Sequence, residues 1–421
     1  MTMHRRDFIS ASAATTLLAG LDISSAYGKE PANIDARKFL SRVVYKRPEV
    51  DGWLKGDQYI FARYNGELGW LLRNAHFDEG VDGSTCYYEY VGDGAHERRT
   101  IAYADKPCRI NTYGDSFTMC HQVNDGETWQ EVLGSHLLEP VRNFGVGAWS
   151  VYQAFLRMKI EEERVPSDLI ILNIYDDDHY RNLDAWRNIR AGKDRRFLCP
   201  PCPHLKVNLE TGKCEEMPNP CPTSDSVYNL CDLDWAVDRF KDDFVLNIML
   251  AHANAKAGNP DRAYQAIMDL TKTHGINTRI DRGDTVSRSA QVLHAKAALL
   301  ATTQIVKWTE EYAKQKGKQV LYVLSFNAGT VARKLSEGTR FDQSFVDYLK
   351  RENLPHVDLL AKHEEEYARF KGSVEQYLAQ YYIGHYNPRG NFFTAMAIKP
   401  KLVEMLDPKP LPYRWDAPAK K

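Results

Sequence analysis

The residues that first suggest chemistry are Gly114, Asp115 and Ser116, which follow a short predicted strand beginning at Arg109. This position predicts a turn between a strand and a helix. The serine would then project from the carboxyl edge of a sheet, where open α/β folds bind their ligands. A serine hydroxyl is a good nucleophile only when a nearby base removes its proton, so a histidine is required in space. Gly-Asp-Ser by itself is also a common turn and helix-cap sequence.

A suitable histidine, His385, lies far along the chain in the sequence GHYNP that starts at Gly384, just before an apolar helix predicted over 392–405. A loop that precedes a final helix can carry an imidazole across the sheet edge to the serine. Alone, His385 is equally well explained as an exposed loop histidine. Together, Ser116 and His385 predict a nucleophile and its general base, a pair suited to acyl transfer.

The two motifs, in this order, resemble those of the SGNH/GDSL hydrolase superfamily, whose nucleophile lies in an N-terminal GDS motif and whose base lies near the C-terminus. The resemblance covers residues 109–182 and 319–405. It implies a flavodoxin-like, doubly wound α/β fold. It also implies an acyl-enzyme mechanism on ester bonds with Ser116 and His385 as the catalytic residues and with no cofactor.

The segment NFGVGAWS, which starts at Asn143, resembles the second block of the superfamily, a turn that donates a backbone N–H to the oxyanion. Ala148 occupies the position of the superfamily's glycine, and Gly147 is the alternative donor. Because the donor is a backbone N–H, alanine can serve if its φ and ψ angles are allowed. The resemblance therefore implies an oxyanion hole formed by Ser116 with Ala148 or Gly147.

The third block, YDDDHYRN starting at Tyr175, departs from the superfamily, which has an asparagine-aspartate pair there. Counted from Asn182, Asp177 takes the place of the oxyanion-hole asparagine, although an ionised carboxylate repels an oxyanion. Three explanations stay open: Asp177 is protonated, the backbone N–H groups suffice, or Asn173 turns toward the oxyanion. The three aspartates of this turn could instead hold a metal or form a solvated acidic loop.

A second departure concerns the acid that orients the histidine. The superfamily places it three residues before the histidine, where this chain has Tyr382. A carboxylate from elsewhere in the chain, or a backbone carbonyl, can replace it. The candidate carboxylates are Asp358, Glu366 and Glu375.

The motifs indicate acyl chemistry but do not fix the acyl acceptor. Some exported relatives with an extra N-terminal β segment act on acylated polysaccharides, so the resemblance implies O-acyl, and in particular acetyl, groups of a carbohydrate. Water as acceptor gives an esterase, and a sugar hydroxyl gives an O-acetyltransferase. Lipase or thioesterase activity and a non-catalytic glycan-binding protein are the alternatives. Aromatic residues near the motifs are expected either to stack on sugar rings or to pack in the core: Trp129, Trp149, Tyr152 and Tyr180.

Apolar runs around these motifs predict the elements that position them. Residues 168–175 and 319–326 are unbroken apolar runs of strand length, which suit strands covered on both faces of a parallel sheet. Residues 127–138 have helical spacing, and another strand is expected at 141–144. Strands that alternate with helices predict a doubly wound α/β core.

The chain as a whole is predicted to divide into five segments. These are a signal peptide at 1–28, a β-rich lead-in at 29–108, the first half of the core at 109–182, a Cys-rich and helical insertion at 183–318, and the second half of the core at 319–410.

Five of the eight cysteines lie within residues 183–232, which are Pro-rich and show no clear periodicity. In an exported protein this clustering favours disulfide bonds, with at least one thiol left free or paired outside the stretch. A zinc site that begins at Cys199 and Cys202 with His204 is the alternative, although a CxxC motif without a matching second pair is a weak signal.

The N-terminus carries two arginines, Arg5 and Arg6, before a short apolar stretch that ends near Leu21. This resembles a twin-arginine export signal with cleavage near Ala26 to Gly28, and it predicts a periplasmic or extracellular protein. The apolar stretch is shorter than the roughly 20 residues that span a bilayer, and no later segment reaches that length.

The charge balance excludes one class of partner. Lysine and arginine number 55 against 56 aspartates and glutamates, so no global positive field attracts nucleic acid. The expected partner is a small-molecule or polysaccharide ester. The oligomeric state is left open.

Overall fold

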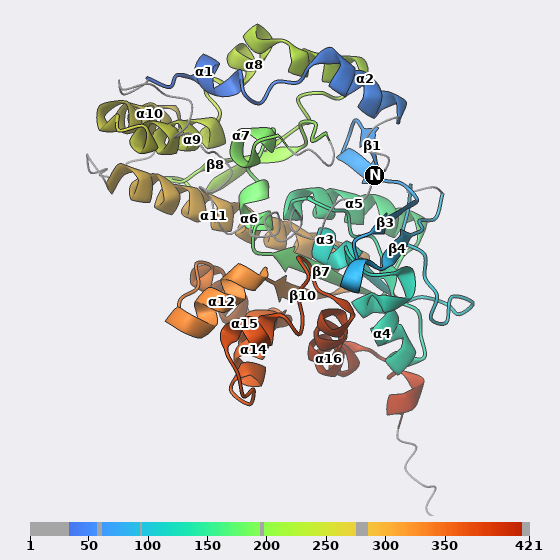
Figure 1. Cartoon of the computed structure of the whole chain (residues 1–421). Helices are drawn as coiled ribbons and strands as arrows, with labels where there is room; N and C mark the ends of the chain where they lie inside the picture. Colours follow the sequence, from blue (N-terminus) through green and yellow to red (C-terminus); the bar gives the residue numbers. More distant parts are fainter. Residues whose placement is uncertain (1–32, 57–60, 93–94, 194–197, 275–284, 415–421) are drawn as a thin grey trace, which may run out of the picture. The chain divides into compact units, whose positions relative to one another are not determined.

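The computed structural model describes residues 33–56, 61–92, 95–193, 198–274 and 285–414 (Figure 1). The expected signal peptide at 1–28 lies outside the described residues. Within them the chain forms two compact units. Residues 72–178 with 306–414 make up the first unit, and residues 33–71 with 179–305 make up the second.

A five-stranded parallel sheet forms the centre of the first unit, in the order β11-β10-β7-β5-β6. Its strands are β5 (Ile110–Tyr113), β6 (Arg142–Asn143), β7 (Leu169–Tyr175), β10 (Gln319–Ser325) and β11 (His356–Asp358). Every side chain of β7 is buried, and so is every side chain of β10 after Gln319, as expected of strands covered on both faces. The predicted α/β class is confirmed, and so are the strands expected before Gly114 and within 141–144, 168–175 and 319–326, whereas β11 was not predicted.

The strand order reverses at β5, because the chain passes from β5 to β6 on one side and then to β7 on the other. In open α/β sheets, ligands bind beyond the carboxyl ends of the strands at such a reversal. The turns that follow β5 and β7 begin at Gly114 and Asp176 and therefore lie at the expected ligand position.

Helices connect these strands and flank the sheet (Figure 1). The helix α4 packs against α16, and α5 packs against β5. Side-chain caps fix where three helices begin: Thr128 caps α4, Ser150 caps α5 and Asn387 caps α16. The helices of this unit are α3 (Ser116–Met119), η2 (Asp125–Glu127), α4 (Trp129–Leu137), α5 (Val151–Arg164), α12 (Ala328–Glu337), α13 (Gln343–Arg351), α14 (Leu359–Tyr367), α15 (Val374–Leu378), α16 (Pro388–Met405) and η4 (Leu411–Tyr413).

The lead-in is less β-rich than predicted. It contains the antiparallel pairs β1 (Ala62–Asn65) with β2 (Gly69–Leu72) and β3 (Ala75–Asp78) with β4 (Thr85–Tyr88), the latter joined through η1 (Val81–Gly83). Before them, however, come the helices α1 (Ala36–Leu40) and α2 (Arg47–Lys55). A proline in the first turn of α2, and the Glu49 carboxylate that accepts the N–H of Lys46, start a helix where alternating polarity had indicated a strand.

The second unit consists mainly of short helices with one further hairpin. The helix α6 (Asp178–Arg181) begins at the last residue of the first unit, and α11 (Thr285–Lys316) ends within the first unit. The remaining elements are α7 (Asn188–Ala191), β8 (His204–Asn208), β9 (Lys213–Met217), η3 (Asp225–Cys231), α8 (Leu233–Phe240), α9 (Phe244–Lys256) and α10 (Pro260–His274). The prediction of a mainly helical segment over 233–318 is confirmed.

All eight cysteines lie within the described ranges, and none of them forms a disulfide there. Cys202 is buried and its thiol donates a hydrogen bond to the carbonyl of Asp184, at 3.2 Å. Burial raises the pKa of Cys202 well above its usual range and raises that of Cys221 to about 12. These thiols pack as small apolar side chains, and the disulfide in exported material stays a prediction.

The structure does not support a zinc site at Cys199, Cys202 and His204. Among the described residues, no group of three or more His, Cys, Asp or Glu side chains is arranged to hold a metal. The ring of His204 instead contacts the carbonyl of Cys202 at 3.1 Å, and burial lowers the pKa of His204 to about 4. Nor does any helix in the described ranges combine the length and apolar character needed to cross a membrane.

Candidate active site

Ser116 stands at the first position of α3, directly after the turn that ends β5. The turn requires glycine at position 114, because its φ is +154° and a Cβ there would lie 2.2 Å from Thr118 Oγ1. Asp115 caps the helix by accepting the N–H of Phe117 at 2.8 Å. The serine that results is 9% exposed, at the carboxyl edge of the sheet.

His385 reaches this serine from the loop before α16. Its Nε2 lies 2.8 Å from Ser116 Oγ, within hydrogen-bond distance. The backbone of the loop is fixed nearby, because the N–H of His385 donates to Gln122 Oε1 at 2.7 Å. Gly384, with φ +127°, lets the loop pass close to that amide, since a Cβ there would lie 2.6 Å from Gln122 Oε1. The structure thus brings together the two residues that the sequence proposed as nucleophile and base.

The aromatic ring of Phe117 forms one wall of the pair. It packs 5.0 Å from the ring of His385, 4.4 Å from that of Tyr175 and 5.2 Å from that of Tyr386, measured between ring centroids. Phe117 and both tyrosines are buried. This packing limits the positions open to the imidazole and excludes water from one side of it.

The hydroxyl of Ser116 has a second polar neighbour. Asp115 Oδ2 accepts a hydrogen bond from Ser116 Oγ at 3.1 Å, and Asp115 is fully buried. The serine proton therefore has two acceptors within reach. Only the histidine can carry that proton to a leaving group, because imidazole serves as base and acid near neutral pH.

The turn predicted to complete the oxyanion hole lies beside the nucleophile. A Cβ on Gly147 would lie 4.0 Å from Ser116 Cβ, so the backbone of this turn runs close to the serine. Ala148 has φ +69°, a left-handed conformation that costs an alanine roughly 1–2 kcal/mol. The two predicted N–H donors, those of Gly147 and Ala148, thus lie in a turn beside Ser116. The positive φ angle of Ala148 indicates that the surrounding structure constrains its backbone.

The three carboxylates of the acidic turn after β7 differ in burial and in hydrogen-bond partners. Asp176 is buried and accepts hydrogen bonds from Asn327 Nδ2 at 2.7 Å and Thr330 Oγ1 at 2.6 Å. Burial raises the pKa of Asp176 to about 7, and the charge of Asp177 adds to the shift. Asp178 accepts the N–H of Tyr175 at 3.2 Å. Asp177, the predicted oxyanion residue, is half-buried between them.

Asn173 does not turn toward the oxyanion. Its amide donates a hydrogen bond to Thr118 Oγ1 at 3.0 Å, below the nucleophile turn. Of the three explanations for the missing asparagine, this one is therefore not realised in the structure.

The three carboxylates proposed to orient His385 each have other partners or lie at the surface. Asp358 pairs with Arg340 and caps α14 through the N–H of Leu360. Glu366 accepts the hydroxyl proton of Tyr381. Glu375 is exposed in the first turn of α15.

The structure instead adds residues that the sequence reasoning missed. The ring of His121 lies edge-to-face against that of His385, with centroids 4.9 Å apart. His121 Nε2 pairs with Glu79 Oε2 at 3.3 Å, and Glu79 follows β3 in the lead-in. A histidine five residues after the nucleophile was a visible signal, but nothing in the sequence linked it to Glu79.

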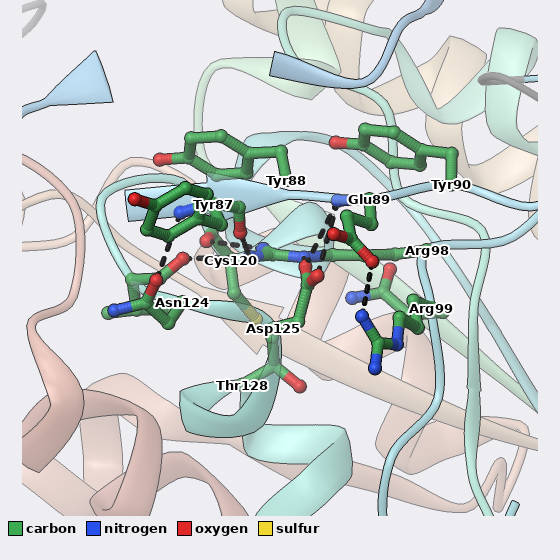
Figure 2. Close-up of polar contacts among 12 residues, drawn as sticks. Tyr87, Tyr88, Glu89, Tyr90, Arg98, Arg99, Cys120, Asn124, Asp125 and Thr128 are labelled. Carbon is green, nitrogen blue, oxygen red and sulfur yellow. Dashed lines mark hydrogen bonds and ion pairs between the residues drawn. The ribbon is translucent and has the colours of Figure 1, made fainter. Parts of the chain in front are cut away.

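A buried arginine holds the loop that carries His121 and Gln122. Arg98 donates to the backbone carbonyls of Met119, Cys120 and Val123 at 2.6, 2.9 and 2.7 Å, and its Nε donates to Asp125 at 2.7 Å. Figure 2 shows its guanidinium between the residues of β4 and Asp125. The loop needs such support, because Cys120 and Gln122 adopt positive φ angles of 62° and 71°.

The aromatic residues considered for sugar stacking are buried. Trp129, Trp149, Tyr152 and Tyr180 are at most 7% exposed, so they pack in the interior. That possibility of the sequence analysis is therefore wrong for these four residues.

Comparison of the sequence with protein-family models finds no match, and comparison with curated proteins finds none.

Proposed function

We propose that this chain is a serine hydrolase of the SGNH/GDSL type that acts on ester bonds, with Ser116 as nucleophile and His385 as general base. The observation that carries the proposal is the 2.8 Å contact between Ser116 Oγ and His385 Nε2. The contact lies at the carboxyl edge of a parallel sheet, where the strand order reverses.

In the proposed reaction, His385 Nε2 takes the proton of Ser116 as Oγ attacks the ester carbonyl carbon. The negative charge on the former carbonyl oxygen is stabilised by N–H groups of Ser116 and of Gly147 or Ala148. His385 then gives the proton to the leaving alkoxide, which leaves an acyl-enzyme. A second cycle, in which water loses a proton to His385 and attacks the acyl carbon, releases the acid and restores the serine.

The proposed substrate is an O-acyl group, and in particular an acetyl group, of a carbohydrate. The limited exposure of Ser116 and the close approach of Gly147 to it favour a small acyl group. If a sugar hydroxyl replaces water in the second cycle, the same residues make an O-acetyltransferase. Phe117 and Tyr175 form an apolar wall next to Ser116, which is compatible with a longer acyl chain. A lipase or thioesterase is therefore a further candidate.

Export to the periplasm or the exterior is part of the proposal and rests on the paired Arg5 and Arg6. Replacement of both arginines with lysine is expected to hold the precursor in the cytoplasm. Fractionation of cells that express the two forms measures this.

The experiment that tests the activity is labelling with a fluorophosphonate, which reacts with activated serines. We expect covalent modification at Ser116 in the wild type and none in Ser116→Ala, identified by peptide mass analysis. Incubation with acetylated glycans, with released acetate and acetyl transfer measured together, then separates esterase from transferase. A folded wild type that stays unlabelled would identify the chain as a binding protein on a hydrolase scaffold.

A further inference from the structure

We infer that Glu79 and His121 form a positioning pair for His385, in a chain that has Tyr382 where the superfamily has its acid, an inference that rests on the proposed function. Glu79 comes from the part of the lead-in after residue 71 and His121 from the loop after α3, and both residues lie in the first unit. Neither region holds the superfamily's acid, which would stand at Tyr382.

The contacts form a continuous chain from the nucleophile to a shielded carboxylate. Ser116 Oγ is hydrogen-bonded to His385 Nε2, and the ring of His385 packs edge-to-face against that of His121. His121 Nε2 in turn lies within ion-pair distance of Glu79. The Glu79 side chain is 8% exposed and that of His121 is 20% exposed, so solvent screens their interaction only partly.

Glu79 is held in place by further contacts. It accepts the hydroxyl proton of Tyr88, and the Tyr88 ring stacks on His121 at 5.9 Å between centroids. The Tyr88 hydroxyl also accepts the N–H of Gln122, the residue whose side chain binds the backbone of His385. The same network therefore fixes the histidine loop and the carboxylate, as a triad acid does for its histidine.

The charge of Glu79 gives the pair its effect. When His385 takes the serine proton it becomes positive, and a carboxylate one ring away stabilises that charge. Other ionisable groups near the two histidines include Asp115, next to Ser116, the hydroxyls of Tyr88 and Tyr386, and Arg98, whose guanidinium lies over the Tyr88 ring. Burial raises the pKa of both tyrosines above the usual range, so they stay neutral. Beyond Glu79, burial and then the charge of Glu79 raise the pKa of Cys86 to about 11, so Cys86 stays neutral too.

The variant Glu79→Gln keeps an acceptor for His121 but removes the negative charge. We expect the pKa of His385 to fall by roughly half a unit to one unit, and the rate of fluorophosphonate labelling to fall several-fold at its plateau. The rising limb of the rate against pH should move to lower pH by the same amount. Glu375→Gln removes an exposed carboxylate and serves as the matched control, with no shift expected.

Two measurements separate the outcomes. NMR titration of the histidine rings, with His385 identified by its absence in His385→Gln, reports the pKa without any turnover. A shift in Glu79→Gln by NMR, with no labelling of the wild type, would retain the pair and refute the hydrolase. Labelling of the wild type with an unchanged His385 titration in Glu79→Gln would refute the pair and leave Asp115 as the charge beside the dyad. A purely structural role predicts a lower melting temperature in Glu79→Ala and no pKa shift in Glu79→Gln, and this result would also overturn the inference.

Discussion

The turns after β5 and β7 meet at the same edge of the sheet, but they hold their carboxylates in different ways. Asp115 is satisfied by its neighbours, since it accepts from Phe117 N and from Ser116 Oγ. Asp176 depends on Asn327 and Thr330, which follow β10 more than a hundred residues later. Among the described residues Asp176 Oδ1 has no hydrogen-bond partner. The first turn is therefore built from local sequence, and the second is completed only by the fold.

The backbone of the two turns differs as well. The turn after β5 packs so closely that only glycine fits at position 114. The turn after β7 contains no glycine, and its three residues are the aspartates 176–178 at the edge of the sheet. The turn after β5 is therefore constrained by close packing, whereas the turn after β7 holds a buried carboxyl whose pKa is raised by burial and by the charge of Asp177. Substitutions at five positions, with two comparison variants, test this contrast.

The largest effect is expected at the nucleophile. Ser116→Ala and His385→Ala should each lower kcat by about three orders of magnitude or more, because the two residues act as one unit. The double variant should be little worse than either single variant. Steady-state kinetics on an acetyl ester measures this, and losses that multiply would show that the two residues work separately.

Gly114→Ala should destabilise the first unit by about 2–4 kcal/mol, because the new Cβ would meet Thr118 Oγ1 at 2.2 Å and Asn173 O at 2.7 Å. Gly147→Ala is the matched control, since its Cβ would find its nearest neighbour at 3.8 Å, an ordinary contact. Denaturant unfolding of both variants measures the difference. Equal stability in the two variants would contradict the close packing of the nucleophile turn.

Asp176→Asn should change how stability depends on pH. A carboxyl whose pKa is raised in the folded state stabilises the protein fully below its unfolded pKa, and this contribution is lost as pH rises through about 7. Between pH 5 and 8 the free energy of unfolding of the wild type should therefore fall by on the order of 2–3 kcal/mol relative to that of the variant. Unfolding at several pH values measures this.

A half-buried acid in the second unit, Asp243, provides the comparison for that experiment. Burial also raises the pKa of Asp243 to about 7, so Asp243→Asn should remove a separate share of the same pH dependence. If the unfolding free energy of Asp176→Asn depends on pH as steeply as that of the wild type, Asp176 is not the group that titrates between pH 5 and 8.

The smallest effect is expected for Asp177→Asn. The charge of Asp177 raises the pKa of Asp176, so its removal should move the pH dependence of stability to lower pH by a few tenths of a unit. Activity should be kept or improved, because the amide supplies the donor that the superfamily has at this position. A loss of activity, together with inhibition of the wild type by chelators, would instead indicate a metal-binding role.

The local sequence determined the parallel strands, the nucleophile turn and the histidine loop. Unbroken apolar runs specify buried strands, because every side chain of β7 must avoid water on both faces. Gly114 and Gly384 were recognised as members of the two motifs, and the structure shows that their positions require backbone angles and close approaches that other residues resist. The helix α2 was missed, although Val50 and Trp53 are buried at helical spacing and a proline stands in its first turn.

Only the tertiary structure shows which side chains surround His385 and Asp176. Asp358, Glu366 and Glu375 were all reasonable in sequence, yet their side chains are directed to Arg340, to Tyr381 and to solvent. Glu79 and His121 reach the site because Arg98 and Tyr88 fix the lead-in against the loop after α3. Such contacts join residues far apart in the chain, and their energy depends on burial and distance, which a linear sequence does not contain.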